Sequence, residues 1–283
     1  MTETRFVRPE QQLLDDLVEQ SLASAGVKEP RHSWAWIETG SSHVVVLAGD
    51  AAVRVARTVE TSATTIRTQL LADALPPLPF GVPTSRSAPT SIDGITAIAS
   101  QRLAGEPQGA DGGEPAQLAM LLGAIHAIDL SGLRTLLNEP RSYLGGAQWY
   151  SVMTQQAIPL LPQDVQTAAL RVADALASLD DDAVVLDHGD LAGANILWEG
   201  DRISGVLDWD LASADDPADD LAAVAGWFGW SAVERFASPA EIARAKIFHD
   251  SFPLQTLCFS LVNDRPDEEV DRATQKATRR LSQ

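Results

Sequence analysis

The chain has 283 residues, enough for a substantial core, and 45% of them are hydrophobic, which is ordinary for a globular protein. Its formal net charge of −18 argues against a nucleic-acid partner and is compatible with a cationic ligand. The one cysteine, Cys258, excludes an internal disulfide and is typical of a small core residue. Neither a signal peptide nor an apolar run of membrane-spanning length is evident, so we expect a cytoplasmic protein without membrane association.

The N-terminal part of the chain combines helical and strand patterns. Residues 9–25 begin with a proline, end before a glycine and repeat leucines on one helical face, which predicts an amphipathic helix. Residues 34–57 change to strand periodicity, with a turn at Gly49–Asp50. Three further segments follow: a helix at about residues 62–75, a stiff proline-bearing connector at 76–83 and a strand at 95–99.

The remaining chain is dominated by helical stripes, beyond a glycine-rich and polar boundary at residues 105–113. One apolar face comprises Leu118, Leu121, Leu122 and Ile125, and a second comprises Val165, Ala169, Val172, Leu176 and Leu179. Residues 264–283 alternate acids and bases, which predicts a solvated amphipathic helix.

Residues 187–195 are the most informative about chemistry. They have the layout H-x-D-L-x-x-x-N of a kinase catalytic loop, with Gly189 where protein kinases place arginine. The next residues predict a β-hairpin whose turn, 199–202, folds Asp208 back beside Asn195. Mg²⁺ prefers a few protein oxygens together with water and phosphate, so Asn195 and Asp208 are candidate metal ligands. Asp190 is the candidate for orienting an attacking hydroxyl group.

These residues resemble those of the antibiotic phosphotransferases, the kinase-like family that modifies aminoglycosides and macrolides. The resemblance is specific over residues 187–222 and weaker over much of 37–222. It implies an α+β, protein-kinase-like fold of two lobes: a nucleotide-binding antiparallel sheet plus helix in residues 1–103, and a mostly helical catalytic and substrate-binding lobe in residues 104–283. It also implies that Asp190 is the catalytic residue and that Asn195 and Asp208 are the metal ligands.

The resemblance assigns nucleotide binding to the N-terminal lobe. The loop containing Ser41 and Ser42 would close over the phosphates, although Gly-Ser pairs are also common in plain turns. Arg54 aligns with the third-strand basic residue that holds the α- and β-phosphates, and arginine offers phosphate a bidentate fork. The hinge, which includes Gln101 and Leu103, would contact the base through its backbone, so GTP and ATP both stay possible.

The helix at residues 62–75 departs from the family pattern. The family normally offers a glutamate from this helix to pair with the basic residue of the strand, and residues 61–75 contain none. Either Glu60 or Asp73 takes that role, or the nucleotide is aligned without this ion pair.

The histidines and acids around the catalytic loop are expected to support its structure. His188 would brace the loop through hydrogen bonds, and His126 would be a packed structural residue. Asp216 and Asp220 belong to the D-P-x-x-D-L pattern of the family, and we expect them to cap a helix and brace the loop.

Three other residues are candidates for substrate binding. Asp210 would either meet a substrate amine or be a solvated loop acid. Trp227 and Trp230 would either wall an apolar pocket or pack in the core.

The predicted reaction is Mg²⁺-dependent transfer of the γ-phosphate of GTP or ATP to a hydroxyl of a small cationic antibiotic, by a monomeric enzyme. Residues 202–209 and 78–83 look close to the macrolide branch and favour a macrolide 2′-phosphotransferase that confers resistance. Asn195 follows the aminoglycoside form, so an aminoglycoside phosphotransferase and a metabolite kinase are alternatives. The alternative of another class is an inactive kinase-like binding module, which the missing glutamate favours and the complete set Asp190, Asn195 and Asp208 disfavours.

Overall fold

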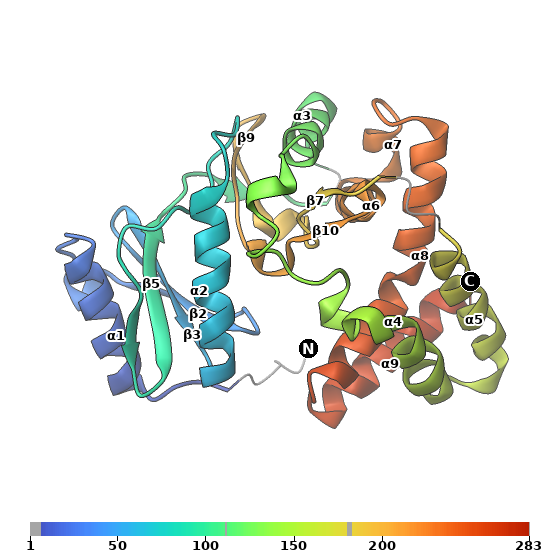
Figure 1. Ribbon diagram of the computed structural model, residues 1–283, viewed down its shortest axis with the longest axis horizontal. Helices are drawn as coiled ribbons and strands as arrows, with labels where there is room; N and C mark the ends of the chain where they lie inside the picture. Colours follow the sequence, from blue (N-terminus) through green and yellow to red (C-terminus); the bar gives the residue numbers. More distant parts are fainter. Residues whose placement is uncertain (1–6, 111, 180–182, 283) are drawn as a thin grey trace. The chain divides into compact units, whose positions relative to one another are not determined.

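A computed structural model describes residues 7–110, 112–179 and 183–282 (Figure 1). The chain divides into two compact units, which we call the sheet unit (residues 7–107 and 194–210) and the helical unit (residues 108–193 and 211–282). An antiparallel N-terminal sheet and a helical C-terminal part confirm the expected α+β class. The boundary after residue 103 stays a prediction, and residues 194–210 group with the sheet unit although they follow much of the helical unit in sequence.

The sheet unit is built on a five-stranded antiparallel sheet with the order β1-β2-β3-β5-β4. Its strands are β1 (Ala35–Ile37), β2 (His43–Ala48), β3 (Ala51–Ala56), β4 (Thr90–Ile92) and β5 (Ile95–Gln101), and its helices are α1 (Gln11–Ser24) and α2 (Val59–Ala74). A second antiparallel sheet comprises β6 (Glu106–Pro107), β8 (Ile196–Glu199) and β9 (Arg202–Val206). The predicted helices and longer strands are confirmed, whereas the short strands β4 and β6 were not expected.

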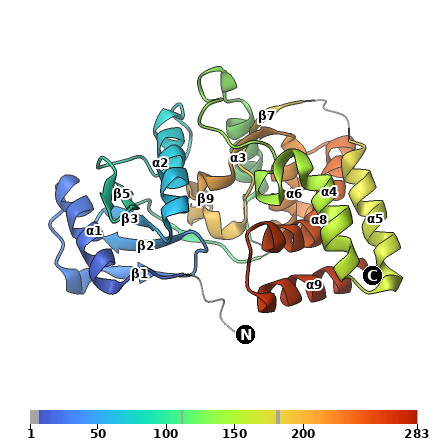
Figure 2. The ribbon, with the colours of Figure 1, turned by 60° about the horizontal axis from the view of Figure 1, so that its bottom comes forward.

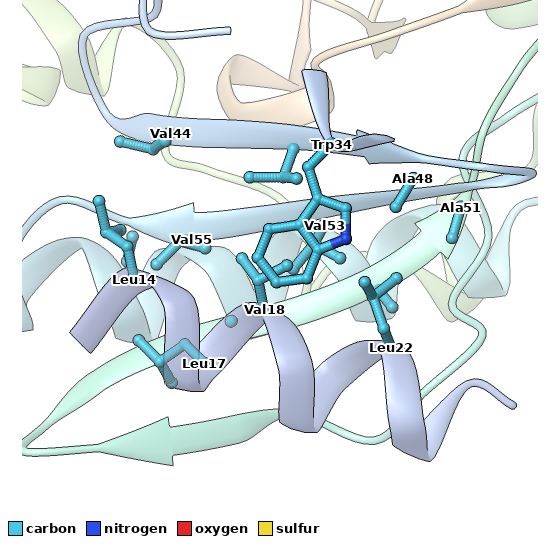
Figure 3. Close-up of a cluster of buried hydrophobic side chains, with 14 of the residues drawn as sticks. Leu14, Leu17, Val18, Leu22, Trp34, Val44, Ala48, Ala51, Val53 and Val55 are labelled. Atoms are coloured by element: carbon cyan, nitrogen blue, oxygen red, sulfur yellow. The ribbon is translucent and has the colours of Figure 1, made fainter. Parts of the chain in front are cut away.

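The five-stranded sheet has two different faces because side chains alternate along a strand. On one face the buried valines of β2 and β3 pack with the predicted apolar stripe of α1 (Figure 3): Val44, Val46, Val53 and Val55 with Leu14, Leu17, Val18 and Leu22. α2 lies on the opposite face (Figures 1 and 2). His43 and Arg54 alternate with the core valines and therefore belong to the face that α2 covers.

The helical unit consists of seven α-helices and one strand pair among its described residues. They are α3 (Pro115–His126), α4 (Trp149–Val152), α5 (Gln163–Ala177), α6 (Pro217–Phe228), α7 (Trp230–Val233), α8 (Pro239–Val262) and α9 (Asp267–Leu281), with β7 (Val185–Asp187) antiparallel to β10 (Ser213–Asp215). The predicted stripes of α3 and α5 are largely buried, and the predicted amphipathic helix of the tail is α9. No helix in the described ranges combines the length and apolarity needed to cross a membrane.

The core of the helical unit joins α5, α8 and α9, which lie together in Figure 2. Cys258 is fully buried in this core, and burial raises the pKa of its thiol to about 12. The expectation that the lone cysteine is a packed core residue is therefore confirmed.

Candidate active site

The loop that contains the predicted catalytic residue Asp190 begins where β7 of the helical unit ends. Gly189 has a φ of +77°, and a Cβ added there would lie 3.0 Å from the carbonyl oxygen of Leu211. The turn therefore favours glycine at the position where protein kinases carry arginine. Asp190 follows this turn half-buried, and its backbone N–H donates to His188 Nδ1 at 3.2 Å. His188 is fully buried, and its hydrogen bond with the Asp190 backbone confirms that it braces the loop.

Asp220 on α6 fixes the backbone of this turn. Its fully buried carboxylate accepts the backbone N–H groups of His188 at 3.0 Å and Gly189 at 3.2 Å. The Nε2 atom of His126 lies 3.2 Å from the same carboxylate. Burial opposes ionisation of Asp220, but the hydrogen bond from His126 and the backbone donors keep its pKa below the ordinary value. The predicted structural roles of Asp220 and His126 are confirmed.

Asp216 has the second structural role expected from the sequence. Its carboxylate accepts the backbone N–H of Ala218 at 2.9 Å and so caps the N-terminus of α6. The guanidinium of Arg244 donates to its other oxygen at 2.6 Å. The helix that carries Asp220 is therefore fixed at the end nearest the loop.

Asp187 is a functional candidate that the sequence reasoning missed. It is 2% exposed, it is hydrogen-bonded to Asp220, and its Oδ1 atom has no hydrogen-bond partner among the described residues. Burial and the charges of Asp220 and Asp219 raise the pKa of Asp187 well above its ordinary value. The raised pKa favours the protonated form of Asp187, which can donate a hydrogen bond to Asp220. Its place at the end of an apolar strand gave no signal of this, because the acids around it come from elsewhere in the chain.

The predicted β-hairpin in the sheet unit is confirmed, and it brings two candidate ligands to one end. Ile196 pairs with Val206, and the N–H of Leu207 donates to the carbonyl of Asn195 at 2.8 Å. Asp208 comes next, with a φ of +58° that is uncommon outside glycine and often marks a functional site. Its side chain is 47% exposed. One amide oxygen and one accessible carboxylate fit Mg²⁺, which completes its shell with water and phosphate.

Arg54 corrects two predictions. Its Nη2 atom donates to Asp210 Oδ2 at 2.7 Å and lies 3.5 Å from Asp208 Oδ1. Neither proposed helix acid takes this role: Glu60 is hydrogen-bonded to Thr58, and Asp73 accepts hydrogen bonds from Ser85 and Gln69, as the contacts of these two acids show. The description of Asp210 as a solvated loop acid is also wrong, since its side chain is only 17% exposed and is paired.

The electrostatics of Asp210 follow from this pairing. Burial disfavours its charged form, but the charge of Arg54 lowers the pKa of Asp210 to about 2. Asp210 therefore has a protein partner, Arg54, and its predicted contact with a substrate amine stays a prediction.

The other predicted nucleotide contacts are spread over the sheet unit. Ser41 and Ser42 lie just before β2, with their hydroxyl oxygens 3.5 Å apart. Gln101 ends β5 and donates its backbone N–H to the carbonyl of Thr84 at 2.8 Å. Leu103 follows and is half-buried. The nucleotide-binding roles of these residues stay predictions.

The two predicted aromatic residues make different contacts in the helical unit. Trp227 is 37% exposed and donates from Nε1 to the carbonyl of Gln108 at 3.1 Å. Its indole lies so close to Gly193 that a Cβ on that residue would overlap it. Trp230 has the ammonium of Lys246 5.4 Å from its ring centroid. The substrate-binding roles of both tryptophans stay predictions.

Comparison with known proteins supports the same conclusion as the motifs. The model of the phosphotransferase enzyme family matches residues 37–250. Viomycin phosphotransferase from Streptomyces vinaceus is 29% identical over 206 residues, which are 66% of this chain and 71% of that protein.

Two solved structures are similar over nearly the whole chain. The GDP complex of wild-type aminoglycoside 2′-phosphotransferase-IIIa has a TM-score of 0.79 and 14% identity, covering 96% of this chain and 99% of that one. Macrolide 2′-phosphotransferase type I has a TM-score of 0.69 and 20% identity, covering 95% of this chain and 98% of that one. Both confirm the expected kinase-like fold. The chain belongs to the phosphotransferase enzyme family and is an enzyme that transfers phosphate to a hydroxyl group.

Proposed function

We propose that the chain transfers the γ-phosphate of GTP or ATP to a hydroxyl group of an antibiotic, with Asp190 as the catalytic residue. The observation that carries this proposal is the turn before Asp190, which Asp220 holds through two backbone N–H groups. A carboxylate presented on a fixed loop can accept a hydrogen bond from the acceptor hydroxyl and orient its oxygen. It takes the proton late, as the bond to phosphorus forms.

The sheet unit supplies the groups for the phosphate donor in this proposal. Asn195 and Asp208 would hold Mg²⁺, which when bound neutralises charge on the phosphate oxygens. Arg54 would contact the nucleotide phosphates, with Ser41 and Ser42 in the loop above them. The similarity to a GDP-bound relative supports GTP as the first donor to test.

We propose that the acceptor is an antibiotic, and three classes of antibiotic are candidates. Viomycin comes first, because viomycin phosphotransferase shares 29% identity with this chain. A macrolide 2′-hydroxyl comes second, on the sequence features at residues 202–209 and 78–83 and on the 20% identity with a macrolide enzyme. An aminoglycoside comes third, on the Asn195 form of the motif and on fold similarity.

A transfer assay with MgCl₂ and either GTP or ATP tests this proposal. Viomycin, a macrolide and kanamycin are offered separately, and mass spectrometry detects the addition of one phosphate to the antibiotic. We expect phosphorylation of one class by the wild type and by Asp201→Ala, which alters an exposed hairpin turn, and none by Asp190→Ala. Nucleotide binding without transfer to any of the three would overturn the antibiotic proposal and favour a metabolite kinase or an inactive module.

A further inference from the structure

A chain of polar contacts inside the sheet unit connects Arg54 to helix α2. Arg54 Nη2 lies 2.7 Å from Asp210 Oδ2 and 3.1 Å from His43 Nδ1. The other ring nitrogen of His43, Nε2, lies 2.7 Å from the hydroxyl of Thr65 on α2. The hydroxyl of Thr65 in turn donates to the carbonyl of Thr61 at 2.9 Å. We call Asp210, His43 and Thr65 the Arg54 relay.

The hydrogen atoms of the relay can be assigned from its chemistry. Arginine only donates hydrogen bonds, so His43 Nδ1 must accept and carry no proton. His43 Nε2 then carries the proton and donates to Thr65, whose own hydrogen is used on Thr61. A neutral imidazole agrees with burial and the nearby Arg54 charge, which lower the pKa of His43 to about 3. His43 therefore orients the guanidinium without repelling it.

The relay leaves two nitrogens of the guanidinium, Nε and Nη1, available. Within the described residues, the contacts of Arg54 with Asp210, His43 and Asp208 all use the single nitrogen Nη2. Nε and Nη1 can therefore each donate a hydrogen bond to a phosphate oxygen, from different edges of the guanidinium. An arginine held at one terminal nitrogen is oriented by the protein and still has its other nitrogens to donate to an anion.

We propose that Asp210 and His43 are positioning residues that orient Arg54 for the phosphates of the nucleotide, and that they replace a carboxylate on helix α2. Thr65 fixes the tautomer and orientation of His43 and connects the relay to that helix. This inference rests on the proposed function in one respect, the contact of Arg54 with phosphate. Under this inference Asp210 contributes to nucleotide binding and does not contact the acceptor.

A double-mutant cycle tests whether these residues act through Arg54. Calorimetry would measure binding of the β,γ-imido analogues of GTP and ATP with MgCl₂ to Asp210→Asn and His43→Gln, each with Arg54 intact and with Arg54→Ala. With Arg54 intact, we expect each variant to weaken binding by about ten-fold, because the guanidinium loses an orienting partner. In the Arg54→Ala background we expect no further weakening. Equal losses in the two backgrounds would overturn the proposal, since they would mean a general structural effect.

Substitutions of Thr65 are a milder test, because they change little besides the presence of a hydroxyl group. Thr65→Val should weaken binding of the analogues by a few-fold, whereas Thr65→Ser should restore wild-type affinity, because the serine hydroxyl can accept from His43. Thr64→Val on the same helix is the matched control and should leave affinity unchanged. Equal affinities of Thr65→Val and wild type would contradict the role of the relay.

These measurements are independent of the acceptor. An enzyme that binds nucleotide through the relay but phosphorylates no antibiotic would contradict the proposed acceptor class and leave this inference intact. Transfer to an antibiotic, together with equal losses of affinity in the two Arg54 backgrounds, would support the proposed acceptor class and contradict this inference.

Discussion

The two units bury acidic side chains in opposite ways. In the sheet unit Asp210 is buried beside the guanidinium of Arg54, and the positive charge keeps it ionised. In the helical unit Asp187 and Asp219 are buried beside Asp220, and burial together with repulsion raises the pKa of both well above the ordinary value. Of these three acids only Asp220 has a lowered pKa, because backbone N–H groups and His126 donate to it.

The two units therefore offset the free-energy cost of burying a carboxylate in two different ways. A buried carboxylate can be compensated by a counter-charge, or it can be compensated by hydrogen-bond donors while the pKa values of its acidic neighbours are raised. The first solution suits a site that must attract phosphate, because it presents an oriented cation. The second suits a support for a catalytic loop, because it fixes backbone atoms.

The largest effect is expected for Asp220→Ala. Removing this carboxylate leaves two buried backbone N–H groups and His126 without their acceptor, so we expect a loss of about 3–5 kcal/mol in the free energy of unfolding. Urea unfolding would measure it, with Asp201→Ala in the exposed turn as the control. A loss below about 1 kcal/mol would contradict the assignment of Asp220 as the ionised centre of the network.

The pH dependence contributed by His43 should come next. Its pKa is about 3 when folded, and an unfolded histidine titrates near 6.5, so only the unfolded chain binds a proton between these values. The free energy of unfolding should therefore fall as the pH falls through this window, by up to about 1.4 kcal/mol per pH unit and roughly 5 kcal/mol at most. Unfolding curves of the wild type and His43→Gln would isolate this contribution.

The exposed His32 provides the control for this measurement. His32→Gln should keep the wild-type pH dependence, and His43→Gln should flatten it. The same slope in all three proteins would mean that the imidazole of His43 titrates freely in the folded state.

A smaller effect is expected for Gly193→Ala. The added methyl group would overlap the indole of Trp227 and shift the loop between Asp190 and Asn195, so transfer should slow by about ten- to hundred-fold. Adding Trp227→Ala should recover part of the rate. Gly123→Ala is the control, because nothing lies within 4 Å of its added Cβ. An unchanged rate in Gly193→Ala would show that Trp227 does not restrict the loop.

The smallest effect is expected for Asp187→Asn. The folded-state pKa of Asp187 is raised, so its stabilising contribution is complete below the unfolded pKa near 3.9 and is lost as the pH rises through the folded pKa. The asparagine amide can donate to Asp220 without titrating. We expect the stability of this variant relative to wild type to increase as the pH rises above about 3.9 in urea unfolding. A gain that does not change with pH would mean that Asp187 is ionised.

The sequence predicted the parts of the site that depend on local order. Asn195 and Asp208 could be placed together because a short hairpin connects them, and Asp216 because a cap followed by proline is a local signal. The sequence also showed that residues 61–75 contain no glutamate to pair with Arg54. It could not supply the replacement, because Asp210 lies 156 residues from Arg54 and any of several acids would have satisfied the same reasoning.

The missed features share a physical cause. The protonation of Asp187 depends on acids that α6 brings beside it, and the need for glycine at residue 193 depends on an indole from the same helix. Neither leaves a periodic pattern or a motif in the chain. The same holds for strands as short as β4 and β6, which are determined by their neighbours in the sheets.

The most direct test of the account is Asp190→Asn, which keeps the shape of the side chain and removes its basic oxygen. Calorimetry with the β,γ-imido analogue of GTP and MgCl₂ would be combined with the rate of phosphate transfer to the antibiotic that the wild type modifies. We expect nearly unchanged nucleotide affinity and a transfer rate lower by about 10²–10⁴-fold. A transfer rate close to that of the wild type would contradict the catalytic role of Asp190.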